Sequence, residues 1–300
     1  MDLIGWWRPP RFVGHNLRGV FLQSEASVMS MINVTLPDGT INEYAEGITC
    51  AEVITDALGR KHGCLAATVD GVEKDMSTKL TSNCSVVGIL STSEEGIHIL
   101  RHSAAHLLAQ AVTELYPGAL PTIGPAIERG FYYDFKMDPI TEADLKAIQK
   151  KMQFLAKQNA VVERIELNEE DLKSHFEHNP YKMEIINDKL EDGAGSTIYK
   201  QGEWYDLCLG PHVPNLSRLM FVKLTSVSSA YWRGDQEREQ LVRIYGLVEP
   251  TKDALQSTLK NIEEAKKRDH RKLGKDLQLF HIDEEVGQGL ILWTPRGSII

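Results

Sequence analysis

Short apolar runs with the alternation of β-strands dominate the chain between residues 31 and 90. Residues 31–44 read MINVTLPDGTINEY, two such runs joined by a Pro-Asp-Gly turn that is typical of a hairpin. Residues 50–63 instead carry apolar side chains at helical spacing, and glycines end that pattern. A second hairpin at 65–76 and a last strand at 85–90 follow. This order predicts a small module in which a sheet packs against one helix.

Longer helical patterns begin after a polar segment, STSEEG, at residues 91–96. We predict this segment to be a linker and the long helix to span residues 97–116, where apolar side chains repeat every three or four residues until Pro117. A loop and an aromatic strand follow at 121–135. Thr141 then begins another helix, because an aspartate three residues later completes a capping box.

The remaining pattern is less regular. Short mixed segments run from residue 161 to 247, and a last helix is predicted over 251–275. New strand-and-loop structure begins within residues 276–300. We therefore predict an α+β chain, with a ubiquitin-like β-grasp domain at 31–92, a mixed α/β domain at 93–250 and a linker helix after it.

Length and composition are those of a globular chain. Its 300 residues are enough for two domains and part of a third, and 42% of them are hydrophobic. No apolar run approaches the roughly 20 residues that span a bilayer. Residues 1–30 lack the features of a secretory signal, so we expect an N-terminal extension that is disordered or follows from a misplaced start codon. The four cysteines have no framework spacing, which favours a reducing cytoplasm.

The net charge of −9 argues against nucleic-acid binding through bulk electrostatics. The charge is uneven, because residues 265–275, which we name the basic strip, carry six Lys or Arg against one Asp. An acidic protein with such a strip can still hold a polyanion locally. The candidate contacts are Lys266, Lys267, Arg271 and Lys272. A solvated helix face is an equally good interpretation of the strip alone.

Two short motifs carry the candidate chemistry. RHSAAHLLAQAV places His102 and His106 four residues apart, so both imidazoles project from one helix face. DLCLGPHVPN repeats that spacing with Cys208 and His212 on a loop. Together these residues make a complete tetrahedral zinc set. A zinc protease is not indicated, because such enzymes need a Glu directly after the first histidine.

Other interpretations of the same region remain open. One or two of the histidines could satisfy hydrogen bonds in the core, although two matched pairs favour a functional site. Cys208 could be a nucleophile, but nothing in the sequence places a histidine beside it. Asp206 could bind a substrate amine, orient an imidazole or cap a turn. Tyr133 fits a strand that packs in the core, and the pattern around Lys182 predicts a surface lysine.

These motifs, in this order, are similar to the N-terminal part of threonyl-tRNA synthetases over residues 31–300. RHSAAHLLAQAV, PTIGPAIERGFYYDF, YKMEI, DLCLGPHVPNL, SAYWRGD and RIYG resemble the family's editing domain, which we expect at residues 93–250. Residues 31–92 resemble its TGS domain, and EEAKKRDHRKLGKDLQLFH resembles its linker helix, expected at 251–275. Alanyl-tRNA synthetases share the HSAAH and CLGPH pattern, but SAYWRGD and the linker favour the threonyl family.

The resemblance implies hydrolysis of the ester in tRNA(Thr) that has been mischarged with serine. His102 and Lys182 would then form the acid/base pair that positions the attacking water and protonates the ribose oxygen. His106, Cys208 and His212 would line the pocket and fix the terminal ribose and the water. The family's editing sites usually work without a metal, so we expect no cofactor for editing and keep zinc as the alternative.

The same resemblance implies a set of substrate-binding residues. Asp206 would hold the seryl ammonium, and Tyr133 with the backbone of Gly124 would form the wall that excludes the methyl group of threonine. Leu209 departs from the family, which often has a basic residue there, so one contact to tRNA is not expected.

The family's aminoacylation site is expected beyond residue 300. Its ATP, Mg and catalytic zinc sites lie in the class II domain, whose first residues we expect at 276–300, and family members homodimerise through that domain. We therefore expect the N-terminal part of a threonine–tRNA ligase, cytoplasmic, with Ser-tRNA(Thr) as its partner and no membrane contact. Two alternatives are a free-standing deacylase that acts in trans and a non-catalytic RNA-binding module built on TGS.

Overall fold

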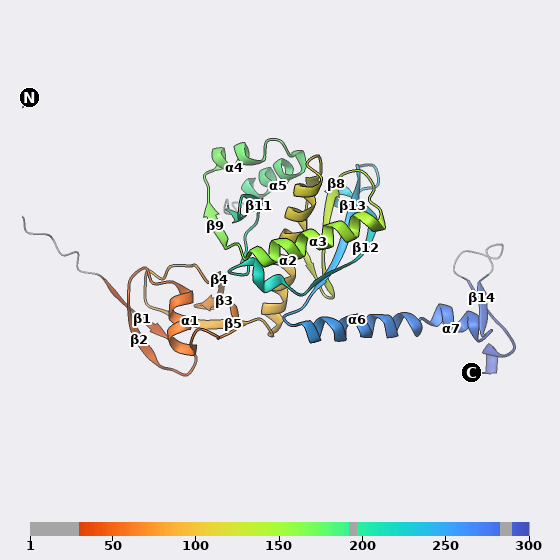
Figure 1. Ribbon diagram of the computed structural model, residues 1–300, viewed down its shortest axis with the longest axis horizontal. Helices are drawn as coiled ribbons and strands as arrows, with labels where there is room; N and C mark the ends of the chain where they lie inside the picture. Colours follow the sequence, from red (N-terminus) through yellow and green to blue (C-terminus); the bar gives the residue numbers. More distant parts are fainter. Residues whose placement is uncertain (1–29, 192–196, 283–289, 300) are drawn as a thin grey trace, which may run out of the picture.

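The computed structural model describes residues 30–191, 197–282 and 290–299, and shows a mixed α+β structure with several sheets (Figure 1). Five strands form the first sheet in the order β2-β1-β5-β3-β4, and they are β1 (Met31–Thr35), β2 (Ile41–Ala45), β3 (Cys64–Val69), β4 (Val72–Asp75) and β5 (Cys84–Leu90). β1 runs parallel to β5, whereas antiparallel pairing joins β1 to β2 and β3 to β4. Both predicted hairpins are confirmed.

Helix α1 (Cys50–Leu58) packs against this sheet. Its first turn is closed by a capping box, because the Thr49 side chain accepts the Glu52 N–H while the Glu52 carboxylate accepts the Thr49 N–H. Its apolar side buries Val53 and Ile54 in one cluster with Val34 of β1. The helical spacing read from the sequence is thus confirmed.

Helix α2 (Glu94–Leu115) follows the first sheet in the chain and runs through the centre of the molecule (Figure 1). Every residue from 103 to 112 is buried, so this helix offers a tightly packed support for a site. The helix begins at Glu94 instead of residue 97, because the Ser93 hydroxyl caps it by accepting the N–H of Gly96. The prediction that residues 91–96 are a linker is therefore wrong for their second half.

A second sheet packs against α2 and α3 (Glu142–Gln158). Its strands follow the order β12-β13-β8-β6, with β7 paired to β8, and they are β6 (Leu120–Pro121), β7 (Ala126–Ile127), β8 (Gly130–Lys136), β12 (Val222–Tyr231) and β13 (Gln240–Val248). The predicted aromatic strand is β8. Helix α3 begins at the predicted Thr141 cap, and Asp144 completes the capping box.

A third, smaller sheet supports the start of the second motif. Its order is β11-β10-β9, and the strands are β9 (Val162–Glu166), β10 (Thr197–Gln201) and β11 (Trp204–Leu207). Helices α4 (Glu169–Phe176) and α5 (Pro180–Glu191) bury Leu172, Phe176 and Ile186 with apolar residues of this sheet. The DLCLGPHVPN motif therefore starts on β11 and continues as a loop.

The last elements extend away from the sheets as an arm (Figure 1). They are α6 (Lys252–Lys267), α7 (His270–Asp276), β14 (Phe280–Ile282) and β15 (Ile291–Trp293). The single helix predicted over 251–275 is wrong, because the chain leaves helical geometry at Arg268. No side chain of α6 is buried, so tertiary packing does not enforce a continuous helix here.

Three short 3₁₀ helices complete the described parts of the chain, at Leu216–Leu219, Trp232–Gly234 and Gly297–Ile299. None of the described helices combines the length and the apolar character needed to cross a bilayer.

Candidate active site

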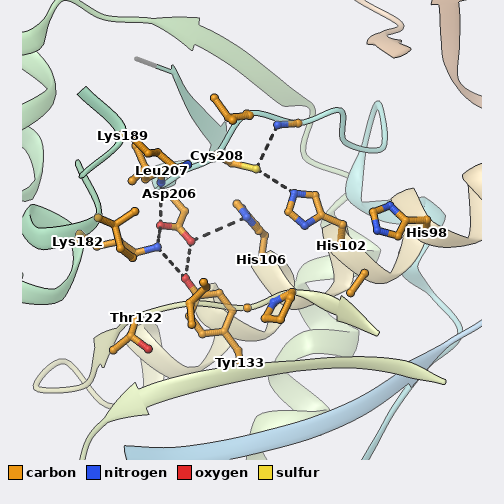
Figure 2. A pocket seen from close by; sticks show the side chains of 17 residues that line it. His98, His102, His106, Thr122, Tyr133, Lys182, Lys189, Asp206, Leu207 and Cys208 are labelled. Carbon is orange, nitrogen blue, oxygen red and sulfur yellow. Dashed lines mark hydrogen bonds and ion pairs between the residues drawn. The ribbon is translucent and has the colours of Figure 1, made fainter. Parts of the chain in front are cut away.

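Residues from α2, β8, α5 and the end of β11 surround a cavity of about 360 Å³ (Figure 2). Helix α2 presents His102 and His106 on one side, because four residues nearly complete a helical turn. The loop after β11 brings Cys208 to them across 106 residues of sequence. Two motifs that are distant in sequence therefore meet at one site.

The His and Cys side chains form a compact cluster. His102 Nε2 lies 2.9 Å from Cys208 Sγ, and His212 Nε2 lies 3.2 Å from the same sulfur. The ring centroid of His106 is 4.3 Å from that of His212. The family resemblance implies that His212 lines the pocket, but this residue is 2% exposed and is not among those that surround the cavity. One ligand atom from each of the four residues lies within 4.8 Å of the other three.

Burial keeps this cluster uncharged at neutral pH. Burial, with a smaller contribution from His106, lowers the pKa of His102 to about 3. Burial likewise lowers the pKa of His106 to about 4 and that of His212 well below its usual value. The same cause raises the pKa of the Cys208 thiol to about 12. The cluster therefore offers three neutral imidazoles and a thiol, which does not favour a thiolate nucleophile.

A buried ion pair lies beside the cluster (Figure 2). Lys182 Nζ is 2.5 Å from Asp206 Oδ1 and donates to the Tyr133 hydroxyl at 3.0 Å, and this hydroxyl donates to Asp206 Oδ2 at 2.6 Å. Burial raises the pKa of Asp206, but the Lys182 charge, His106 and the hydrogen bonds outweigh it and the pKa falls below its usual value. The surface position predicted for Lys182 is wrong, since this side chain is 3% exposed.

Gly124 and Tyr133 form one wall of the cavity. A Cβ atom at Gly124 would overlap ring carbons of Tyr133, so only glycine lets the loop approach the ring this closely. Tyr133 is 1% exposed, and its ring stacks on Phe135 at 5.0 Å between centroids. The tyrosine is therefore both a core residue and a fixed part of the wall.

Comparison with known proteins gives a consistent family. Residues 196–245 match the family described as "Threonyl and Alanyl tRNA synthetase second additional domain". The chain is 45% identical to the threonine–tRNA ligase of Pelobacter propionicus over 91% of its own length and 43% of that protein, and 44% identical to that of Chlorobaculum tepidum over 89% and 41%. The ligase of Streptococcus thermophilus is 43% identical over 90% of this chain and 42% of its own length.

This chain is a homologue of threonine–tRNA ligases. It spans about two-fifths of the length of the curated relatives it matches. The matched family segment covers the second motif, with Asp206, Cys208 and His212, and ends within β13.

The structure adds contacts to this candidate site that sequence reasoning missed. Ser103 Oγ lies 3.0 Å from His212 Nδ1 and accepts the N–H of Val213 at 3.0 Å. Asp75, from the first sheet, accepts the backbone N–H of His212 at 2.9 Å. Ser103 could have been found from its place inside the histidine motif. Nothing near Asp75 in the sequence signals its role.

The four-residue cluster fits a zinc ion by the chemistry of its donors. Three neutral imidazoles and one cysteine sulfur, which loses its proton to bind as a thiolate, are the ligand types that zinc takes in tetrahedral sites. The Ser103 contact holds one imidazole so that its Nε2 faces the sulfur, as outer-shell partners do in metal sites. These residues could hold a metal, and their geometry is also compatible with a network of hydrogen bonds.

The basic strip lies apart from the cavity, on the α6–α7 arm. Lys266, Lys267 and Lys272 are exposed, and Lys267 Nζ donates to Glu264 Oε1 at 3.0 Å. The side chain of Arg271 lies outside the described part of the structure. The arm therefore offers solvent-facing positive charge at some remove from the candidate active site.

Proposed function

We propose that this chain is the N-terminal, proofreading part of a threonine–tRNA ligase and hydrolyses tRNA(Thr) that carries serine. The observation that carries the proposal is the cavity in which a neutral His/Cys cluster adjoins a buried Lys182–Asp206 pair. We propose that residues 31–92 form a TGS domain of β-grasp fold and residues 93–250 the editing domain. Residues 251–275 then form the linker, and 276–300 begin the class II domain.

Discrimination between two similar amino acids explains the need for such a site. Serine lacks one methyl group of threonine, and a pocket rejects an amino acid with a missing methyl by only about 1–3 kcal/mol. A second site that is too small for threonine can remove the error by hydrolysing the seryl ester. On this proposal the wall of Gly124 and Tyr133 excludes the extra methyl group, because the Gly124 backbone already lies directly against the Tyr133 ring.

The ion pair supplies the proton for the leaving group. An ammonium has three protons, and Lys182 uses two of them on Asp206 and Tyr133. The third can pass to the ribose oxygen as the ester C–O bond breaks. Since the carboxylate of Asp206 stays charged beside the cavity, it can also attract the seryl ammonium.

The cluster acts on the water. His102 is neutral at physiological pH, so it can accept a hydrogen bond from the water; its low pKa means that it holds the water's proton only transiently, as the oxygen attacks the ester carbon. His106 and Cys208 line the cavity and fix the water and the terminal ribose, while His212 supports them from outside the cavity by its contacts with Cys208 and the His102 ring. The proton on His102 later returns through solvent to Lys182. Serine and free tRNA(Thr) are the products.

We propose that this hydrolysis runs without a metal. A zinc ion on His102, His106, Cys208 and His212 would act as a Lewis acid toward the water. Aminoacylation, with its ATP, Mg and catalytic zinc, is assigned to the remainder of a full-length relative, as is homodimerisation. We further propose a cytoplasmic location and tRNA contacts by the basic strip.

The decisive experiment compares hydrolysis of Ser-tRNA(Thr) and Thr-tRNA(Thr) by this chain, with and without a chelator. We expect rapid loss of serine alone, indifferent to the chelator, and a His102→Ala variant that is slower by about 10²–10⁴-fold. Loss of activity on chelation would replace the metal-free mechanism by a zinc mechanism. Equal hydrolysis of both esters, or full activity of His102→Ala, would refute the assignment.

A further inference from the structure

A buried acid from the first sheet reaches the candidate active site. Asp75 is the last residue of β4, an edge strand of that sheet, and is 8% exposed. Its Oδ1 accepts the backbone N–H of His212 at 2.9 Å, and its Oδ2 accepts the Tyr199 hydroxyl at 2.6 Å. Both partners lie more than 120 residues further along the chain, since the separations are 137 and 124 residues.

Both groups that donate hydrogen bonds to Asp75 lie in or against the loop from Cys208 to His212. The Tyr199 ring lies 4.4 Å from the His212 ring between centroids. Its hydroxyl is packed so closely against Gly210 that a Cβ there would overlap it. Gly210 in turn donates its N–H to Cys208 Sγ at 3.2 Å. One carboxyl group therefore fixes the loop that carries two of the four cluster residues, through a main-chain and a side-chain bond.

These contacts cannot be replaced by solvent. The N–H of His212 lies in a loop with no ladder or helix partner, and His212 and Tyr199 are each 2% exposed. A buried donor that loses its acceptor suffers its full desolvation penalty, so the loop would move to find another partner. A shift of about 1 Å at a catalytic group lowers a rate by up to 10²-fold.

The first sheet is also packed into the same core as the site. Leu65, Ala66 and Ile89 of β3 and β5 are buried in one cluster with residues of α2, Tyr199 and Cys208. The hydrogen bonds of Asp75 thus span an interface that is already closed by apolar packing. The sheet can transmit its position to the loop because both sides of the contact are rigid.

We propose that Asp75 is a positioning residue for the editing reaction, and that the first sheet holds the Cys208–His212 loop in its active geometry through it. This inference rests on the proposed function for its catalytic readout. It assigns the first sheet a part in the chemistry of the second motif, in addition to any contact with RNA.

The kinetic test uses the full chain and single-turnover hydrolysis of Ser-tRNA(Thr). Asp75→Ala is expected to lower the maximal rate about 10- to 100-fold with unchanged KM, because the loop moves while the tRNA contacts stay. Tyr199→Phe removes one of the two donors and keeps the ring, so a loss of about fivefold is expected. Asp75→Asn keeps one acceptor oxygen, so its hydrolysis rate should lie between the rates of Asp75→Ala and Tyr199→Phe. Glu73→Gln, an exposed acid on the same strand, is the matched control and should stay within about twofold of the parent.

A second readout follows the loop without catalysis. Alkylation of Cys208, mapped by peptide mass spectrometry, should be at least about tenfold faster in Asp75→Ala and unchanged in Glu73→Gln, with the cysteines of the first sheet as internal references. All measurements are made below the unfolding temperature of each variant, where a purely structural role leaves both rates at the parent value. Parent-like hydrolysis and parent-like alkylation in Asp75→Ala would overturn the proposal. If the parent chain itself does not hydrolyse Ser-tRNA(Thr), the proposed function fails, and the alkylation rates still decide whether Asp75 positions the loop.

Discussion

Removal of the Lys182 ammonium should leave a carboxylate buried without its counter-charge. Lys182 is 3% exposed and Asp206 is 1% exposed, and Nζ lies 2.5 Å from Oδ1. Breaking such a buried pair by removing one partner typically costs about 3–5 kcal/mol, because the remaining charge keeps its desolvation penalty and loses its compensation. We therefore expect Lys182→Met to lower the free energy of unfolding by about 3–5 kcal/mol at pH 7.

A second lysine provides a control with nearly the same geometry. Lys173 Nζ lies 2.6 Å from Glu169 Oε1 on α4, but these side chains are 38% and 59% exposed. Solvent screens such a pair, so Lys173→Met should cost no more than about 0.5 kcal/mol. The two variants differ mainly in burial, which makes their difference a direct measure of its effect.

Urea unfolding of the full chain, followed by circular dichroism and fluorescence, measures both free energies. The double variant Lys182→Met with Asp206→Asn should recover part of the loss, since it buries no net charge and the amide oxygen still accepts from one of the two donors, the Tyr133 hydroxyl or the Leu207 N–H. If Lys182→Met costs no more than Lys173→Met, the folded chain does not hold a buried ion pair and the proton donor must be sought elsewhere.

Three further predictions concern pH, specificity and tRNA. Burial lowers the pKa of His106 from 6.5 to about 4, so below pH 6.5 the unfolded chain binds more protons than the folded chain. The free energy of unfolding must therefore decrease as the pH falls, and His106 alone accounts for a decrease of about 2 kcal/mol at pH 5. Urea titrations at pH 7 and pH 5 measure it, and an equal loss in His106→Gln would contradict it. Gly124→Ala should displace the Tyr133 ring and lower the ratio of Ser-tRNA(Thr) to Thr-tRNA(Thr) hydrolysis by about tenfold, whereas an unchanged ratio would remove this wall from the specificity argument. Changing the four candidate residues of the basic strip to Ala should weaken tRNA binding and reduce its salt slope by about 3, and an unchanged slope would identify a solvated face.

Local rules explain which elements the sequence predicts correctly. The helix at Thr141 is predictable because its capping box is complete within four residues. The hairpins of the first sheet are predictable because a turn and its two strands are neighbours in the sequence. The start of α2 is missed because Ser93, its cap, lies within a run of polar residues that also fits a linker. The break at Arg268 is missed because no nearby proline or glycine precedes it.

The residues of the candidate site also fall into those that the sequence predicts and those that it does not. His102 and His106 are predictable as a pair, because their relation is set by one helix. The burial of Lys182 is not predictable from its neighbours, because it depends on an aspartate that is 24 positions later and on the Tyr133 hydroxyl from another strand. The contact of Asp75 with the site is even harder to predict, because its acceptor oxygen binds a main-chain N–H. Every residue except proline has such an N–H, so the sequence does not indicate this partner.

The distribution of charge in the cavity links these elements to the proposed reaction. The cluster of imidazoles and thiol is neutral at physiological pH, and the charges of Lys182 and Asp206 offset each other. In the proposed reaction a seryl ester would bring one further positive charge, its ammonium, next to the Lys182 ammonium. Two adjacent cations repel, so transfer of one proton from Lys182 would relieve this repulsion. On the proposed mechanism that proton passes to the ribose oxygen, and an ester without a free ammonium receives no such assistance.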